Sequence, residues 1–223
     1  MINDWKLGMK MMRHAYGIKM NCILGGMILV LGIASIALGG TVRDVFPATY
    51  LVMAAGMLPT QMLYSLSITG MIQASPMKKK LQTSIPAMVN FTIMSAMYLV
   101  TVLIYGIMLT GKPEEQSYAC MNLIMLAFML AVVMFYMGVA YKYFIIASVI
   151  MIPILCLTLS TGLTNKEWLY QLLAWEKFRF WQTAVGGIGI LAVGAVLQCL
   201  SSLLVYKAPI DKLSQSAFLR RVM

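Results

Sequence analysis

The stretch AMVNFTIMSAMYLVTVLIYGIML, residues 87–109, decides the fold class, because it carries no charged side chain over the length of a membrane-crossing helix. Such a helix needs about 20 mostly apolar residues, since every backbone polar group must be hydrogen-bonded within its own segment. Similar apolar runs precede and follow this stretch in the sequence, and we therefore expect an all-α, polytopic membrane protein with six transmembrane helices. Only Lys142 and its two neighbouring tyrosines separate the fourth span from the fifth, so five and seven spans are the competing counts. The predicted spans are Asn21–Gly40, Ala48–Ile72, Ala87–Leu109, Tyr118–Tyr141, Tyr143–Thr161 and Thr183–Tyr206.

The composition agrees with a membrane protein. Hydrophobic residues make up 61% of the 223-residue chain and charged residues 11%, whereas a soluble domain carries about 25% charged residues. The formal charge of +10 does not indicate a nucleic-acid partner, because no basic patch interleaves with aromatic residues on a soluble face. The four cysteines have neither metal-site nor redox-motif spacing, and we expect them to fill apolar space.

The lysines and arginines predict the orientation of the spans, because they favour the cytoplasmic side. With both termini in the cytoplasm, the formal charge of +10 falls on the inner segments, and the acids balance the bases on the outer segments. The inner bases are Lys6, Lys10, Arg13, Lys19, Lys78, Lys79, Lys80, Lys142, Lys207, Lys212, Arg220 and Arg221. The outer bases are Arg43, Lys112, Lys166, Lys177 and Arg179.

The first 19 residues predict an amphipathic helix that lies in the membrane interface. An apolar stripe recurs at helical spacing beside a basic stripe, and such a helix binds anionic lipid through both. The alternative is a short flexible tail. The residues of the apolar stripe are Trp5, Met9, Met12 and Tyr16.

Residues 73–86 predict a short basic cytoplasmic helix between the second and third spans. Ser75 before Pro76 is typical of a helix start, and Pro86 is expected to break the chain before the next span. The alternative is an ordinary loop whose three lysines, Lys78 to Lys80, only set the topology.

We expect the chain to consist of three parts: an amphipathic interfacial helix over residues 1–19, a transmembrane domain over 20–206 and a cytoplasmic tail over 207–223. Residues 164–182 are rich in tryptophan and leucine, and they predict one or two short helices in the outer interface. An interfacial helix without a role in transport is the equally open alternative.

The predicted spans contain no Asp, Glu, Lys, Arg or His. Intramembrane acids, bases and histidines mark proton relays, ion-coupling sites or catalysis, so we expect neither a catalytic residue nor a metal site, and not an enzyme. No phosphate-binding glycine loop is present either. Gln61, Asn90 and Gln198 could line a pathway, although interhelical hydrogen bonding is the more usual role of such residues.

The combined layout resembles the membrane subunit of type-2 ABC permeases, the exporter-like class of six-span half-transporters. The resemblance covers the whole chain through its architecture, and its local motif is Ala74-Ser75-Pro76-Met77-Lys78-Lys79-Lys80-Leu81. It implies that residues 1–19 are an elbow helix and that the loop over 73–86 is a coupling helix for a separate ABC ATPase. The implied coupling residues are Ser75, Pro76, Met77, Lys78, Lys79, Lys80, Leu81 and Thr83.

The resemblance also implies the partners. These are the ATPase, which binds ATP and Mg, a second permease subunit (the same chain or a sister chain) and membrane lipid. We expect no cofactor on this chain, a multi-pass location in a bacterial plasma membrane, and export of a peptide, lipid or drug-like amphipathic molecule. Two alternatives stay open: the substrate-binding membrane subunit of a vitamin importer, and a non-transport immunity or sensor protein.

Overall fold

The computed structural model describes residues 2–13, 18–39, 41, 50–52, 54–58, 70–164 and 179–210. Helices make up nearly all of this part, and no strand occurs among these residues. The elements are α1 (Ile2–Arg13), α2 (Ile18–Leu38), α4 (Gly70–Ala74), α5 (Lys78–Gln82), α6 (Ser84–Gly111), the 3₁₀ turn η1 (Pro113–Glu115), α7 (Gln116–Ala140), α8 (Phe144–Thr164) and α10 (Phe180–Val205).

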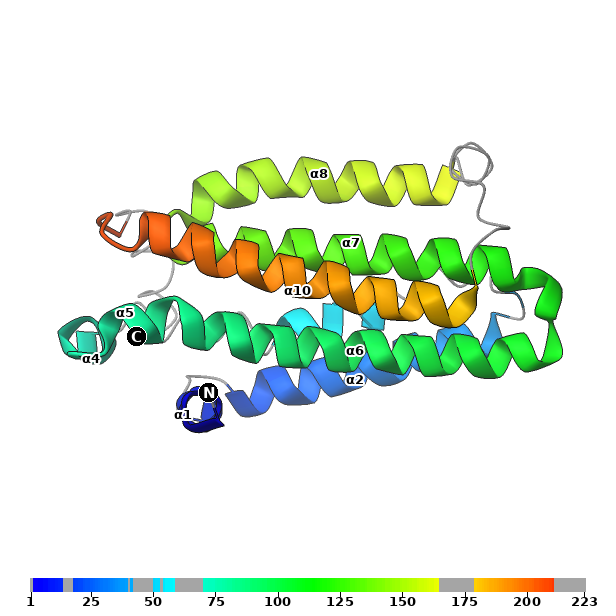
Figure 1. The fold of residues 1–223 in the computed structure, drawn as a ribbon, viewed down its shortest axis with the longest axis horizontal. Helices are drawn as coiled ribbons and strands as arrows, with labels where there is room; N and C mark the ends of the chain where they lie inside the picture. Colours follow the sequence, from blue (N-terminus) through cyan, green and yellow to red (C-terminus); the bar gives the residue numbers. More distant parts are fainter. Residues whose placement is uncertain are drawn as a thin grey trace.

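The long helices lie side by side in an elongated bundle (Figure 1). The short elements α1, α4 and α5 lie at one end, where α10 also ends, and the connection between α6 and α7 lies at the other. Within the described ranges, four helices are long and apolar enough to cross a membrane, as expected of a membrane protein. They are Ile18–Ile36, Lys78–Gly111, Pro113–Ala140 and Phe180–Val205.

The count of six spans remains a prediction. The fifth predicted span corresponds to α8, a helix of 21 residues that contains the apolar stretch Phe144–Ile154. Most of the second predicted span falls outside the described residues, as does most of the segment over 164–182.

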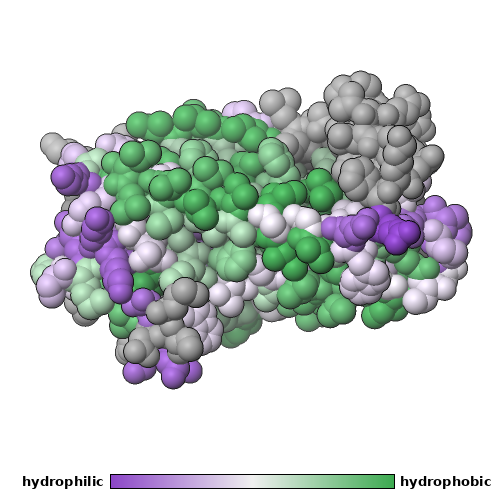
Figure 2. All heavy atoms as spheres, in the orientation of Figure 1, coloured by the Kyte–Doolittle hydropathy of each residue, from purple (hydrophilic) through white to green (hydrophobic). Residues whose placement is uncertain are grey.

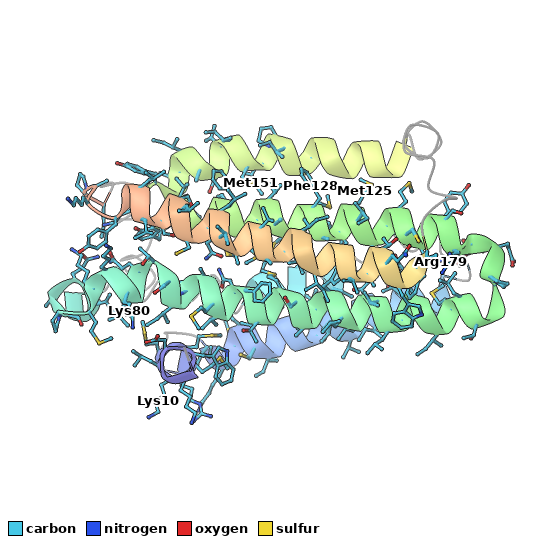
Figure 3. The ribbon with its side chains drawn as sticks, viewed as in Figure 1. Lys10, Lys80, Met125, Phe128, Met151 and Arg179 are labelled. Carbon is cyan, nitrogen blue, oxygen red and sulfur yellow. The ribbon has the colours of Figure 1, made fainter. Side chains whose placement is uncertain are left out.

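Basic side chains gather at one end of the bundle. Figure 2 shows apolar side chains over the middle of the visible face and hydrophilic ones towards its two ends. In Figure 3, Lys10 and Lys80 lie at the end that holds α1 and α5, and Arg179 lies towards the opposite end. In the described part of the chain, basic side chains are therefore more frequent at one end of the bundle, which is the asymmetry from which the orientation of the spans was predicted.

The centre of the bundle is the pair formed by α7 and α10, which is the most extensive helix contact in the described structure. Gly138 faces the side chain of Ser201, and Gly194 lies so close to α7 that an added Cβ would be 2.7 Å from the Cα of Ala131. Small residues at these positions let the two backbones approach, which helices in lipid need because packing rather than the hydrophobic effect holds them together.

Hydrogen bonds fix the register of this pair near the basic end of the bundle. The Ser202 hydroxyl donates to the Gly138 carbonyl at 3.2 Å, and the Tyr141 hydroxyl donates to the Ser202 carbonyl at 2.9 Å. The helix α6 packs on both members of the pair. The helix α8 packs on α7, with Met151 buried and directed towards that helix (Figure 3).

The helix α2 joins the bundle through the helical residues 50–52 and 54–58. Gly32 of α2 lies against Val52, and Gly25 lies against the Ala55 carbonyl. On the other side of this segment, Gly56 lies against Met97 of α6. Residues 50–52 and 54–58 are therefore held between α2 and α6.

A glycine-to-alanine pair in α10 tests the close approach of α7 and α10. Gly194→Ala should lower the Tm in detergent by roughly 2–4 °C, because overpacking that costs about 2 kcal/mol exceeds the gain in helix propensity of about 1 kcal/mol. Gly189→Ala is the matched control, since an added Cβ there meets no atom of the described structure within 4 Å. Thermal unfolding should show an unchanged or raised Tm for the control, and equal behaviour of the two variants would contradict the packing described.

Candidate partner-docking site

The segment between α4 and α5 forms a tight turn at the basic end of the bundle. The Lys78 N–H donates to the Ser75 carbonyl at 3.0 Å, and the Met77 N–H donates to Ser75 Oγ at 3.2 Å. Met77 has φ −91° and ψ 11°, which are the angles of the third residue of a type I turn with Pro76 at the second position. The helix start predicted at Ser75–Pro76 is therefore two residues too early: Ser75 and Pro76 open a β-turn, and α5 begins at Lys78.

The joint between α5 and α6 is a single residue, Thr83. Its φ of −119° and ψ of −79° depart from regular helix, but its N–H and its hydroxyl both donate to the Lys79 carbonyl, at 3.1 Å and 2.7 Å. The break expected before the third span is present but lies at Thr83, three residues before Pro86, which stands in the first turn of α6, where its missing N–H costs no helical hydrogen bond. Residues Lys78–Gly111 thus form one nearly continuous helical rod of 34 residues.

The helix α1 packs against the start of this rod. Gly8 allows close contact, since an added Cβ would lie 2.6 Å from Val89 Cγ2 and 2.9 Å from Ile85 Cγ2. Met12 is buried against Val89, and Leu7 and Met11 pack around Ile85 and its neighbours.

The residues of the predicted apolar stripe of α1 differ in their exposure. Met12 is buried, whereas Trp5 and Met9 are each 37% exposed, and Tyr16 lies outside the described residues. At 100° per residue, Trp5 and Met9 lie between the packed face and the basic face, which carries Lys6 and Lys10. An exposed apolar strip beside a basic strip is the arrangement expected of a helix at a lipid interface.

An ion pair links α1 to α5. Lys80 Nζ lies 3.1 Å and 3.3 Å from the two carboxylate oxygens of Asp4. The hydrogen bond from Lys80 is the main cause that holds the pKa of Asp4 below its ordinary value. Sequence reasoning treated Lys78–Lys80 as equivalent and missed this pair, because the partners are 76 positions apart and no local spacing connects them.

The predicted coupling residues differ in their exposure. Pro76, Met77, Lys79 and Lys80 are exposed, Ser75 and Lys78 are half-buried, and Leu81 and Thr83 are buried. The exposed residues border a groove of about 490 Å³ that Cys199 and Leu203 of α10 complete. Only the turn and the outer face of α5 are therefore open to a partner, and Leu81 and Thr83 hold the segment in place.

The predicted pathway residues do not gather around this groove. Asn90 and Gln198 are fully buried, and both lie against α7 near Met137 and Gly138. Gln61 lies outside the described residues. The pathway assignment stays a prediction, and the positions of Asn90 and Gln198 agree equally well with a packing role.

The described residues contain no group of three or more histidine, cysteine or acidic side chains that could hold a metal ion. Comparison of the chain with protein-family models, with curated proteins and with solved structures finds no match. A functional assignment must therefore come from the residues and geometry themselves.

The Lys80–Asp4 pair should anchor α1 in a pH-dependent way. Because the folded protein lowers the pKa of Asp4 below 3.8, the pair stabilises the contact above about pH 4 and is lost as the pH falls through the lowered value. At neutral pH, Asp4→Asn should raise hydrogen exchange of the α1 amides roughly two- to fivefold. The difference from the unmodified protein should narrow below pH 4 once intrinsic exchange rates are corrected.

Two further variants check that this effect passes through the ion pair. Lys80→Ala should reproduce the effect of Asp4→Asn, and the double variant should add little to either one. Lys79→Ala removes a neighbouring exposed charge and should leave exchange in α1 unchanged. Additive effects of the two pair-breaking variants would show that Asp4 acts through another group.

Proposed function

We propose that this chain is the permease subunit of an ATP-binding cassette transporter, and that a separate ATPase subunit docks on the turn and outer face of α5. The observation that carries the proposal is the nearly continuous rod Lys78–Gly111, which joins an exposed basic turn directly to the transmembrane core. A partner that pushes on Met77 or Lys79 would move α6 as a body, because only Thr83 interrupts the rod.

The exposed turn has the chemistry of a docking surface. Pro76 and Met77 give an apolar centre, and Lys79 and Lys80 give a charged edge, which is the usual arrangement of apolar core and polar rim in a protein interface. The rigid β-turn presents these side chains with little conformational entropy left to lose on binding.

The packing gives a route from that surface to the rest of the bundle. The helix α6 contacts both α7 and α10, and α1 follows α5 through the Lys80–Asp4 pair and the contact of Gly8. Movement of α5 would therefore shift the elbow helix and the centre of the bundle together.

The energy for transport would come from the partner. The predicted spans offer no Asp, Glu, Lys, Arg or His for proton or sodium coupling, and ATP with Mg would bind and react in the ATPase. The cargo would be a peptide, lipid or drug-like amphipathic molecule, carried between this chain and a second permease subunit in a bacterial plasma membrane.

Purification from the native host's membranes tests this function. The tagged protein should bring down an ABC ATPase in stoichiometric amount, identified by mass spectrometry. The double variant Met77→Ala, Lys79→Ala should reduce the recovered ATPase roughly tenfold or more, if these side chains are central contacts. It leaves Lys78 and Lys80 in place, so the orientation signal is largely kept.

The matched control is Lys6→Ala, Met9→Ala, which removes one exposed lysine and one exposed methionine from α1 at the same end of the bundle. It should leave the recovery of ATPase unchanged. A chain that is purified alone but binds a small vitamin-like ligand would instead indicate the importer subunit. An unrelated stoichiometric partner would indicate an immunity or sensor protein, and either result would refute the proposal.

A further inference from the structure

Three lysines from separate parts of the chain meet around one cavity at the basic end of the bundle. Lys78 begins α5, Lys142 lies in the turn between α7 and α8, and Lys207 follows α10. The cavity measures about 490 Å³, which is within the range of roughly 300–1,000 Å³ that small-molecule sites occupy. Gln73 and Tyr206 add polar side chains to its wall. The cavity is separate from the groove beside Met77, with which it shares no lining residue.

Lys142 makes this cavity unusual, because its side chain is almost entirely buried. Lys142 is 2% exposed, and its ammonium lies 5.5 Å from the centre of the Tyr141 ring, where a cation–π contact compensates for part of the lost hydration. No carboxylate occurs among the described residues that line the cavity. A buried charge normally has a counter-charge, since removal from water alone is unfavourable.

The electrostatics around Lys142 would favour a bound anion. Burial is the main cause that lowers the pKa of Lys142, and the nearby charge of Lys78 lowers it further. An anion between the two ammonium groups would reverse both effects, because it would replace the lost hydration and screen the repulsion between like charges.

We propose that this cavity binds the phosphate of an anionic phospholipid headgroup. Lysine ammonium groups bind phosphate as point charges, so they do not need the bidentate geometry of an arginine. Three ammonium groups on three separate segments would surround the anion. Tyr206 can donate a further hydrogen bond from its hydroxyl. Basic pockets between transmembrane helices on the cytoplasmic side are suited to such headgroups.

The neighbouring apolar side chains favour a lipid over a free anion. Leu204, one helical turn before Lys207, is 84% exposed, and Ile146, four residues after Lys142, is also exposed. A phospholipid could place its phosphate in the cavity and its acyl chains along these side chains, whereas inorganic phosphate would use only the lysines. This inference does not depend on an ATPase partner.

The proposal is tested on the full-length protein in neutral detergent, by native mass spectrometry with phosphatidylglycerol as the probe. The unmodified protein should bind one such lipid in preference to phosphatidylcholine. Lys142→Met should raise the Kd for phosphatidylglycerol roughly tenfold or more, because a hydrogen-bonded charge contact is lost. It should fold normally, since replacing an uncompensated buried charge by an apolar side chain of similar shape is neutral or stabilising.

Lys79→Gln is the matched control, because it removes an exposed charge beside Lys78 at the same end of the bundle, from a residue that does not line the cavity. Its Kd should stay within about twofold of the original, since an exposed charge outside the cavity contributes little to binding within it. Lys207→Gln, at an exposed position, gives a second cavity variant that should weaken binding even if Lys142→Met did not fold.

Three results would overturn the proposal. Equal loss of binding in Lys142→Met and Lys79→Gln would show diffuse attraction between a basic surface and lipid. Displacement of phosphatidylglycerol by inorganic phosphate at similar concentration would show a site for a free anion. Absence of lipid binding, together with loss of a co-purified protein in the cavity variants alone, would show that an acidic protein segment occupies the cavity.

Discussion

The close approach of α7 and α10 is the constraint on which the rest of the structure depends. In lipid, helices gain little from burying apolar surface against one another, so the glycines at 138 and 194 matter because they allow backbone contact and interhelical hydrogen bonds. The helix α6 packs on both helices of this pair, and α8 packs on α7. The same register brings Lys142, which follows α7, and Lys207, which follows α10, to one cavity.

The sequence predicted most of the long helices within a few residues. The run over 87–109 lies in α6, and the run over 118–141 corresponds to α7. This success has a simple cause: the bilayer core is a uniform solvent, so the length of an uncharged run reports directly on the helix. The turn at Ser75–Pro76 was predicted less well, because serine before proline begins β-turns as readily as helices.

The details of the candidate sites could not be read from the sequence in the same way. Hydropathy gives the number and length of helices but not the face that each turns towards its neighbour. The lysines at 78, 80, 142 and 207 look alike as orientation signals, yet one forms an ion pair with Asp4 and the other three share a cavity. Those differences arise only from tertiary contacts between segments far apart in the chain.

The continuity of α5 with α6 has a consequence for the depth of the protein in the membrane. At 1.5 Å per residue, the 34-residue rod is about 50 Å long, whereas the hydrocarbon core of a bilayer measures about 30 Å. Even with an ordinary tilt, part of the rod must stand outside the hydrocarbon. The thickness of the host membrane would thus set how far the exposed turn projects into the water, and the same chain would present that turn differently in thin and thick bilayers.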